Sequence, residues 1–184
     1  MNLGFFPGRK RKAPRGFSLV ELLVVISIIG LLMGLVSVAV PRAIRMAKVA
    51  KARAEMTAIL SAIKAYQNEY SRLPNPTGDT SGGDVWLAGG DSKNLMKVLT
   101  GQNVNGQNPK KVRFLEGPDE SGNFQDPWKK GNDYGQYKVK LDLDGSGTVE
   151  YYGDINLTAI VISYGDSGSQ ESPITSKTNL FSWK

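Results

Sequence analysis

The feature that most constrains this chain is an apolar run from Phe17 to Val40, 24 residues in which the only charged side chain is Glu21. About 20 apolar residues in a helix cross the hydrocarbon core of a bilayer, so the run predicts a membrane-spanning helix. A carboxylate within such a helix costs roughly 2.5–3.5 kcal/mol at the bilayer centre and less near an interface. Glu21 is therefore predicted to be functional and to need a partner.

The segment before the apolar run supplies a candidate partner. Cleavage between Gly16 and Phe17 would create an α-ammonium group at Phe17, which Glu21 of a neighbouring chain could neutralise. That pairing suits a subunit that assembles better than a lone membrane anchor. Residues 1–16 contain five basic side chains and no acidic one, and such a leader predicts an N-terminus held in the cytoplasm with the following domain outside it.

Composition narrows the functional classes. Without residues 1–16 the chain keeps 18 basic and 17 acidic side chains, a net charge of +1 instead of +6, so the high isoelectric point does not favour nucleic-acid binding. The chain has no cysteine and hence no disulfide. It also has no histidine, the commonest general base and zinc ligand. We therefore expect no enzymatic activity.

Residues 16–30, Gly-Phe-Ser-Leu-Val-Glu-Leu-Leu-Val-Val-Ile-Ser-Ile-Ile-Gly, resemble the N-terminal methylation motif of type IV pilins and type II secretion pseudopilins. The resemblance extends to about Leu73. It implies that a prepilin peptidase cuts after Gly16 and methylates Phe17, and that Glu21 guides docking into a homo-oligomeric helical filament. It also implies an inner-membrane protein with a single span and a periplasmic C-terminal domain, whose partners include an assembly platform and minor pseudopilins.

The sequence is expected to divide into four segments. These are a leader at 1–16, a transmembrane and filament-core helix at 17–40, an amphipathic second half of that helix at 41–74, and a globular pseudopilin domain at 75–184. Apolar residues at spacings of three and four between Met56 and Tyr70 predict one buried stripe on the second half. Pro41 interrupts the run, and Pro74 and Pro76 predict a helix end near Arg72.

The remainder predicts a small sheet. A short helix is expected around residues 92–99, and strands at 112–115, 137–143, 148–152 and 158–164. The predicted fold class is therefore α+β and type IV pilin-like, with a long N-terminal α-helix packed on a small antiparallel β-sheet.

A second resemblance lies in the predicted domain. Asp126-Pro127-Trp128, followed by Tyr134, Tyr137 and Ser163-Tyr164-Gly165-Asp166, is similar to the major pseudopilin of type II secretion. In that family the first turn precedes a strand pair, and the later turn opens an acidic calcium loop that closes with a tryptophan, which Trp183 could match. Here the acids between Gly165 and Trp183 are only Asp166 and Glu171, which puts the full family calcium site in doubt.

Another segment carries the acidity instead. Residues 142–150 place Asp142, Asp144 and Ser146 at alternating positions, with a glycine sixth, as in the first half of an EF-hand loop. The twelfth position is Gly153 and not glutamate, so a complete EF-hand is not expected. An ordinary Asp/Gly turn between two strands is the alternative. The predicted calcium ligands are Asp142, Asp144, Ser146 and the Thr148 carbonyl, joined by Glu150, Asp154 and Asp166.

These patterns predict a structural subunit of a type II secretion pseudopilus, assembled into a periplasmic filament that drives protein export. The alternative is a surface type IV pilin for adhesion, motility or DNA uptake. A row of cations between Arg42 and Arg53 has three interpretations. It could bind nucleic acid, anionic lipid, or the acidic side chains of neighbouring subunits. The last two are favoured, and no nucleic-acid partner is expected.

Overall fold

The computed structural model describes residues 16–79, 83–128, 136–151, 153–165 and 180–182, and divides into two compact units, Met1–Ala43 and Ile44–Lys184. Helix α1, Leu19–Tyr70, belongs to both units and is continuous through Pro41. It ends at Tyr70 because Ser71 adopts a positive φ of 54°, a backbone conformation that terminates a helix. That end lies two residues before the predicted one.

The first unit has no core of its own within its described part. Every described side chain from Phe17 to Val40 is exposed, and the apolar stretch of α1 is long and apolar enough to cross a membrane. Side chains of this kind need lipid or other apolar helices around them, because water disfavours so large a contiguous apolar surface.

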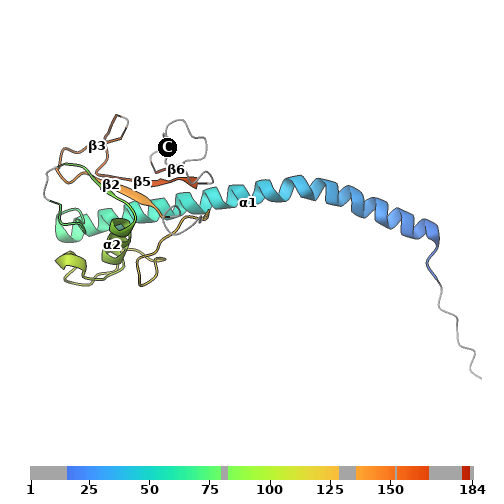
Figure 1. Ribbon diagram of the computed structural model, residues 1–184, viewed down its shortest axis with the longest axis horizontal. Coiled ribbons are helices and arrows are strands. Elements are labelled where there is room, and N and C mark those ends of the chain that lie inside the picture. The colour runs from blue at the N-terminus through green and yellow to red at the C-terminus, as the bar shows by residue number, and fades with distance from the viewer. Residues whose placement is uncertain (1–15, 80–82, 129–135, 152, 166–179, 183–184) are drawn as a thin grey trace, which may run out of the picture. The chain divides into compact units, whose positions relative to one another are not determined.

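In the second unit α1 is amphipathic, as predicted. Its buried side chains recur at spacings of three and four and form one face. From Met56 to Tyr66 they pack with the sheet and with α2, Gly90–Leu99, whose own buried face includes Leu95 and Leu99. Figure 1 shows α2 and the sheet beside this half of α1. The buried residues of α1 are Ala52, Met56, Ile59, Ala62, Ile63 and Tyr66.

The main sheet has the strand order β1-β2-β5-β6, and every neighbouring pair is antiparallel. Its strands are β1 (Val85–Leu87), β2 (Lys138–Leu141), β5 (Ala159–Ser163) and β6 (Leu180–Phe181). A separate two-stranded hairpin pairs β3 (Val149–Glu150) with β4 (Asp154–Ile155), and a short 3₁₀ helix η1 covers Val104–Gly106. The long helix and small antiparallel sheet confirm the predicted α+β class.

Alternation along the strands gives the sheet two buried faces. Val139 and Leu141 of β2 point into the core shared with α1, whereas Lys140 between them lies on the opposite face. There the β3–β4 hairpin covers Ile160 and Ile162 with Val149. The sheet is therefore a middle layer, and a lysine on its second face must find a buried partner.

One predicted strand, residues 112–115, is wrong. The segment pairs with no strand in the described chain, because its backbone donors are used elsewhere. The amides of Phe114 and Leu115 donate to the Leu99 carbonyl at the end of α2, at 2.8 and 3.0 Å. The Val112 amide donates to the Asn108 side chain. The amides of this β-rich segment therefore cap the end of α2 instead of pairing with a strand.

Candidate processing, junction and cation sites

The predicted processing site lies just before α1 begins. Gly16 and Phe17 precede the helix, and the Phe17 side chain is 87% exposed. Ser18 and Glu21 then cap the N-terminus of α1 with two reciprocal hydrogen bonds. The Ser18 amide donates to Glu21 Oε2 at 2.8 Å, and the Glu21 amide donates to Ser18 Oγ at 3.2 Å. This is a capping box, which satisfies two amides that the helix itself leaves without partners.

The capping box gives Glu21 a role within its own chain that the sequence analysis missed. The signal was present as Ser18-x-x-Glu21 directly before an apolar run, the pattern by which capping boxes are recognised. The cap engages Oε2. A carboxylate oxygen has capacity for more than one hydrogen bond, so capping and pairing with an ammonium group are compatible.

The two pieces of the predicted second motif meet in the structure. Asp126 is 3% exposed, and its Oδ1 accepts the Trp128 amide at 3.1 Å. Its Oδ2 accepts the hydroxyl of Ser163, at 2.6 Å and 37 residues away in sequence. The Gly165 amide donates in turn to Ser163 Oγ at 3.2 Å. Asp126 thus ties the turn at 126–128 to the end of β5.

Tyr137, also part of that motif, joins the sheet to the long helix. It is fully buried, and its hydroxyl donates to Glu55 Oε2 of α1 at 2.5 Å. Burial first, and then the neighbouring Glu55 carboxylate, raise the pKa of Tyr137 above its ordinary value. The phenol is therefore a neutral donor with a structural role. Tyr134, Asp166 and Trp183 lie outside the described residues.

The predicted calcium loop, 142–148, is a tight turn built around one carboxylate. Asp142 is 3% exposed, and its Oδ1 accepts the amides of Gly145 and Ser146 at 2.9 and 3.1 Å. Its Oδ2 accepts the Gly147 amide at 2.8 Å, with Gly147 in a left-handed conformation at φ 80°. Asp144 Oδ1 accepts the Ser146 amide at 2.8 Å.

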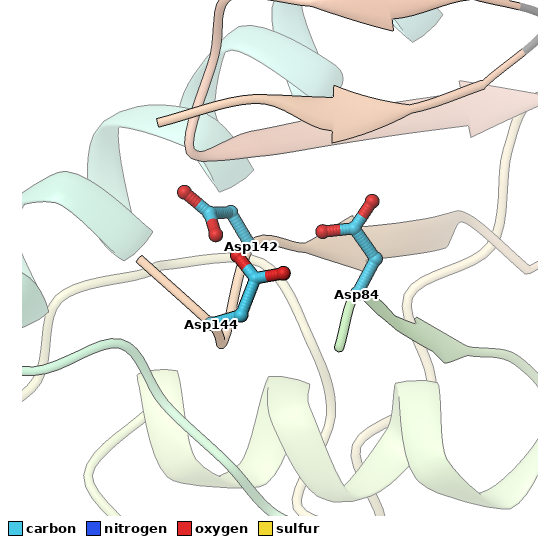
Figure 2. A group of neighbouring side chains, drawn as sticks. All are labelled: Asp84, Asp142 and Asp144. Atoms are coloured by element: carbon cyan, nitrogen blue, oxygen red, sulfur yellow. The ribbon is translucent and has the colours of Figure 1, made fainter. Parts of the chain in front are cut away.

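A third carboxylate joins this turn from a distant part of the chain. Asp84, just before β1, brings a carboxylate oxygen within 4.8 Å of those of Asp142 and Asp144 (Figure 2). Asp84 was not predicted from the sequence, because it lies 58 residues before Asp142 and carries no local signal. The hydrogen bond from the Ser146 amide holds the pKa of Asp144 below its ordinary value.

The same Asp84 also pairs with the buried lysine of β2. Lys140 Nζ lies 3.1 Å from Asp84 Oδ2, and the two side chains are 9% and 12% exposed. Asp84 Oδ2 accepts the Glu150 amide at 2.6 Å, and Lys140 Nζ donates to the Glu150 carbonyl. The ion pair therefore holds β3, and with it the hairpin, against the sheet.

The other predicted calcium ligands are arranged differently. The Ser146 hydroxyl donates to the Thr148 carbonyl at 3.0 Å, so these two oxygens are hydrogen-bonded to each other within the turn. Glu150 and Asp154 face each other across β3 and β4, both exposed, and lie outside the group of three carboxylates.

The donor set near Asp84 fits a hard cation in its chemistry, because calcium is bound by carboxylate and carbonyl oxygens. Asp84 Oδ1 supports the fit: within the described part of the chain it is buried and lacks a hydrogen-bond partner. Two features oppose it. Asp142 already accepts backbone amides on both oxygens, and the Lys140 ammonium stands beside Asp84.

Comparison with known families gives a match at the N-terminus. Residues 11–37 match the prokaryotic N-terminal methylation motif. The match spans the leader junction and most of the apolar run, and it supports a type IV pilin-like protein that is processed from a prepilin and assembles into filaments. The exposed apolar half of α1 fits the membrane anchor of such proteins. No curated protein and no solved structure matches the chain.

Proposed function

We propose that this chain is a structural subunit of a type II secretion pseudopilus, inserted in the bacterial inner membrane with its globular domain in the periplasm. The observation that carries the proposal is the bond between Asp126 and Ser163, which joins the two sequence pieces similar to the major pseudopilin. Prepilin peptidase would release the mature chain, and an assembly platform with minor pseudopilins would add it to a filament that drives export.

The exposed first half of α1 supports assembly by helix packing. Isoleucine, leucine and valine side chains cover it on all sides, from Leu19 to Val40. A filament needs a contact between two different surfaces that does not close on itself, and the side-by-side packing of such helices provides one. In the membrane the same side chains contact lipid, so that assembly exchanges lipid contacts for contacts with neighbouring helices.

The proposal is tested by deleting the gene and restoring it on a plasmid. A pseudopilus subunit predicts that exported enzymes accumulate in the periplasm of the deletion strain and reach the medium again on complementation. If export is normal while surface fibres, twitching or DNA uptake are lost, the chain is a surface pilin instead. Neighbouring genes for a secretin and secretion ATPase, as against a retraction ATPase, give an independent check.

Processing gives the first prediction. The protein isolated from its native membrane should lack residues 1–16 and carry one methyl group on the Phe17 amine, because the 16–17 bond is exposed and precedes the helix. Intact-mass measurement decides this. The same protein from a strain without prepilin peptidase serves as the control and should retain the leader. A mature protein that still contains residues 1–16 would remove the basis for filament assembly.

We also propose that the turn at 142–148 binds calcium, with Asp84, Asp142 and Asp144 as carboxylate ligands. Ser146 and the Thr148 carbonyl are candidate further ligands, as are Glu150 and Asp154 if the β3–β4 hairpin moves toward the turn. Asp166, a further candidate, lies outside the described residues. Bound calcium would neutralise part of the clustered negative charge. Because Asp84 also holds β3 through Glu150, the ion would stabilise the hairpin as well as the turn.

The calcium proposal predicts a higher melting temperature of the detergent-purified chain in millimolar calcium than in chelator. At 100 times Kd, binding only to the folded state stabilises by about 2.7 kcal/mol, roughly 5–10 °C for a chain of this size. Asp144→Ala should abolish the difference. Asp119→Ala is the matched control, since Asp119 also holds a turn through the amides of Ser121 and Asn123. Equal melting temperatures with calcium and with chelator would leave an ordinary acidic turn.

A further inference from the structure

Helix α1 carries a row of basic side chains just after its apolar run. Between Glu21 and Glu55 the sequence has no acidic residue but has five basic ones. Among the described residues, Lys51 is the one member of this row that forms an ion pair, with Glu55 at 3.8 Å. Arg45 is exposed and Lys48 half-buried. The five are Arg42, Arg45, Lys48, Lys51 and Arg53.

The position of Arg45 and Lys48 along the chain places them near a membrane surface. Arg45 follows Val40 by five residues, and five helical residues rise about 7.5 Å. Because Val40 and Arg45 belong to the same continuous helix, Arg45 lies about 7.5 Å along the helix axis from the end of the apolar run. The headgroup layer on each side of a bilayer is roughly 5–7 Å thick. Lys48, one turn further on, can extend its long side chain back toward that layer.

The residues between these cations have the character of an interfacial segment. Ile44 and Met46 are 52% and 66% exposed, although both are large and apolar. A helix that presents apolar side chains among lysines and arginines binds at the boundary between headgroups and acyl chains. In addition, several acids of the second unit are already paired within the chain: Glu55, Glu69, Glu116 and Asp84. Fewer acids are thus free to pair with a neighbouring subunit.

We propose that Arg45 and Lys48 bind the phosphates of anionic phospholipid headgroups where α1 leaves the membrane. The proposal rests on the membrane anchoring contained in the proposed function. Its consequence is a position for the subunit before assembly: the cations hold the helix at a set depth, so that the start of the second unit lies at the membrane surface. Removal of the basic leader by processing would leave this as the main basic flank of the span.

The test measures lipid retention by the full chain. Native mass spectrometry of protein released from micelles doped with equal amounts of phosphatidylglycerol and phosphatidylcholine reports which lipid stays bound. We expect a preference for phosphatidylglycerol that falls about fivefold for each cation removed, since one cation near an anionic surface contributes about 1 kcal/mol. The variant is Arg45→Gln/Lys48→Gln. The matched control, Lys64→Gln/Lys111→Gln, removes the same charge from exposed positions elsewhere in the second unit.

Each outcome separates this inference from the proposed function. If wild-type protein retains neither lipid, the headgroup site is overturned. If it retains both lipids equally, or if the variant keeps the wild-type preference, the headgroup site is overturned and anchoring stands. If the variant keeps that preference but no longer forms filaments, the cations bind acids of neighbouring subunits instead. A loss of preference in the control as well would show a net-charge effect and also overturn the site.

Discussion

Replacement of Glu21 by glutamine should abolish filament assembly while leaving the start of α1 capped. Glutamine keeps an oxygen for the Ser18 amide, because capping boxes accept either Glu or Gln, but it removes the negative charge. A Phe17 ammonium in the apolar layer then has no counter-charge, at a cost of at most roughly 2.5–3.5 kcal/mol. That corresponds to about a hundredfold lower affinity of the filament end for each added subunit. The loss recurs with every subunit that is added.

Three variants separate the two roles of Glu21. Ser18→Ala loses the hydroxyl that caps the Glu21 amide, at a cost of about 1 kcal/mol in helix stability, yet keeps the carboxylate. It should still assemble. Glu21→Ala loses both roles and should fail, like Glu21→Gln. Filaments are counted by electron microscopy and by sedimentation after induced assembly. If Glu21→Gln assembles normally while Ser18→Ala does not, Glu21 acts through the cap and the charge pairing is wrong.

The long-range parts of the fold were predictable where a pattern repeats along the chain. The stripe from Met56 to Tyr66 recurs at helical spacing, so the buried face of α1 could be read from the sequence. The strands β2 and β5 have the composition expected of buried strands and are confirmed. Residues 112–115 have a similar composition, but their amides bond to Leu99 and Asn108, and strand pairing is a property of the partner as much as of the segment.

The candidate sites were likewise predictable where their residues are close in sequence. Gly16, Phe17 and Glu21 lie within six residues of one another, and the motif match at 11–37 covers them. The turn at 142–148 is local as well, and its alternating oxygens indicated a compact acidic turn. Asp84 could not be predicted, because it reaches that turn only through the pairing of β1 with β2, which sets Val85 opposite Leu141. The buried position of Lys140 follows from the same register.

The largest stability effect is expected at the Asp84–Lys140 ion pair. Asp84→Ala leaves the Lys140 ammonium in a site where the side chain is 9% exposed, with the Glu150 carbonyl as its remaining hydrogen-bond acceptor and the Trp86 ring 5.8 Å away. Removal of one partner of a buried pair costs about 3–5 kcal/mol, because the other charge stays buried without compensation. Typical domains have only about 5–15 kcal/mol in total. We therefore expect the variant to be close to unfolding.

The measurement is urea unfolding of the full chain in detergent, followed by tryptophan fluorescence, since all three tryptophans lie in the second unit. Chelator is present throughout, so that a lost calcium ligand does not contribute.

Glu116→Ala is the control. It breaks an ion pair with Arg113 in which the Arg113 and Glu116 side chains are 62% and 80% exposed, and it should cost at most about 1 kcal/mol. The double variant Asp84→Leu/Lys140→Met should recover most of the loss, because apolar residues of similar size often replace a buried pair without destabilisation. If Asp84→Ala is no more costly than Glu116→Ala, the pair does not hold the hairpin to the sheet, and the second face of the sheet depends on Val149, Ile160 and Ile162 alone.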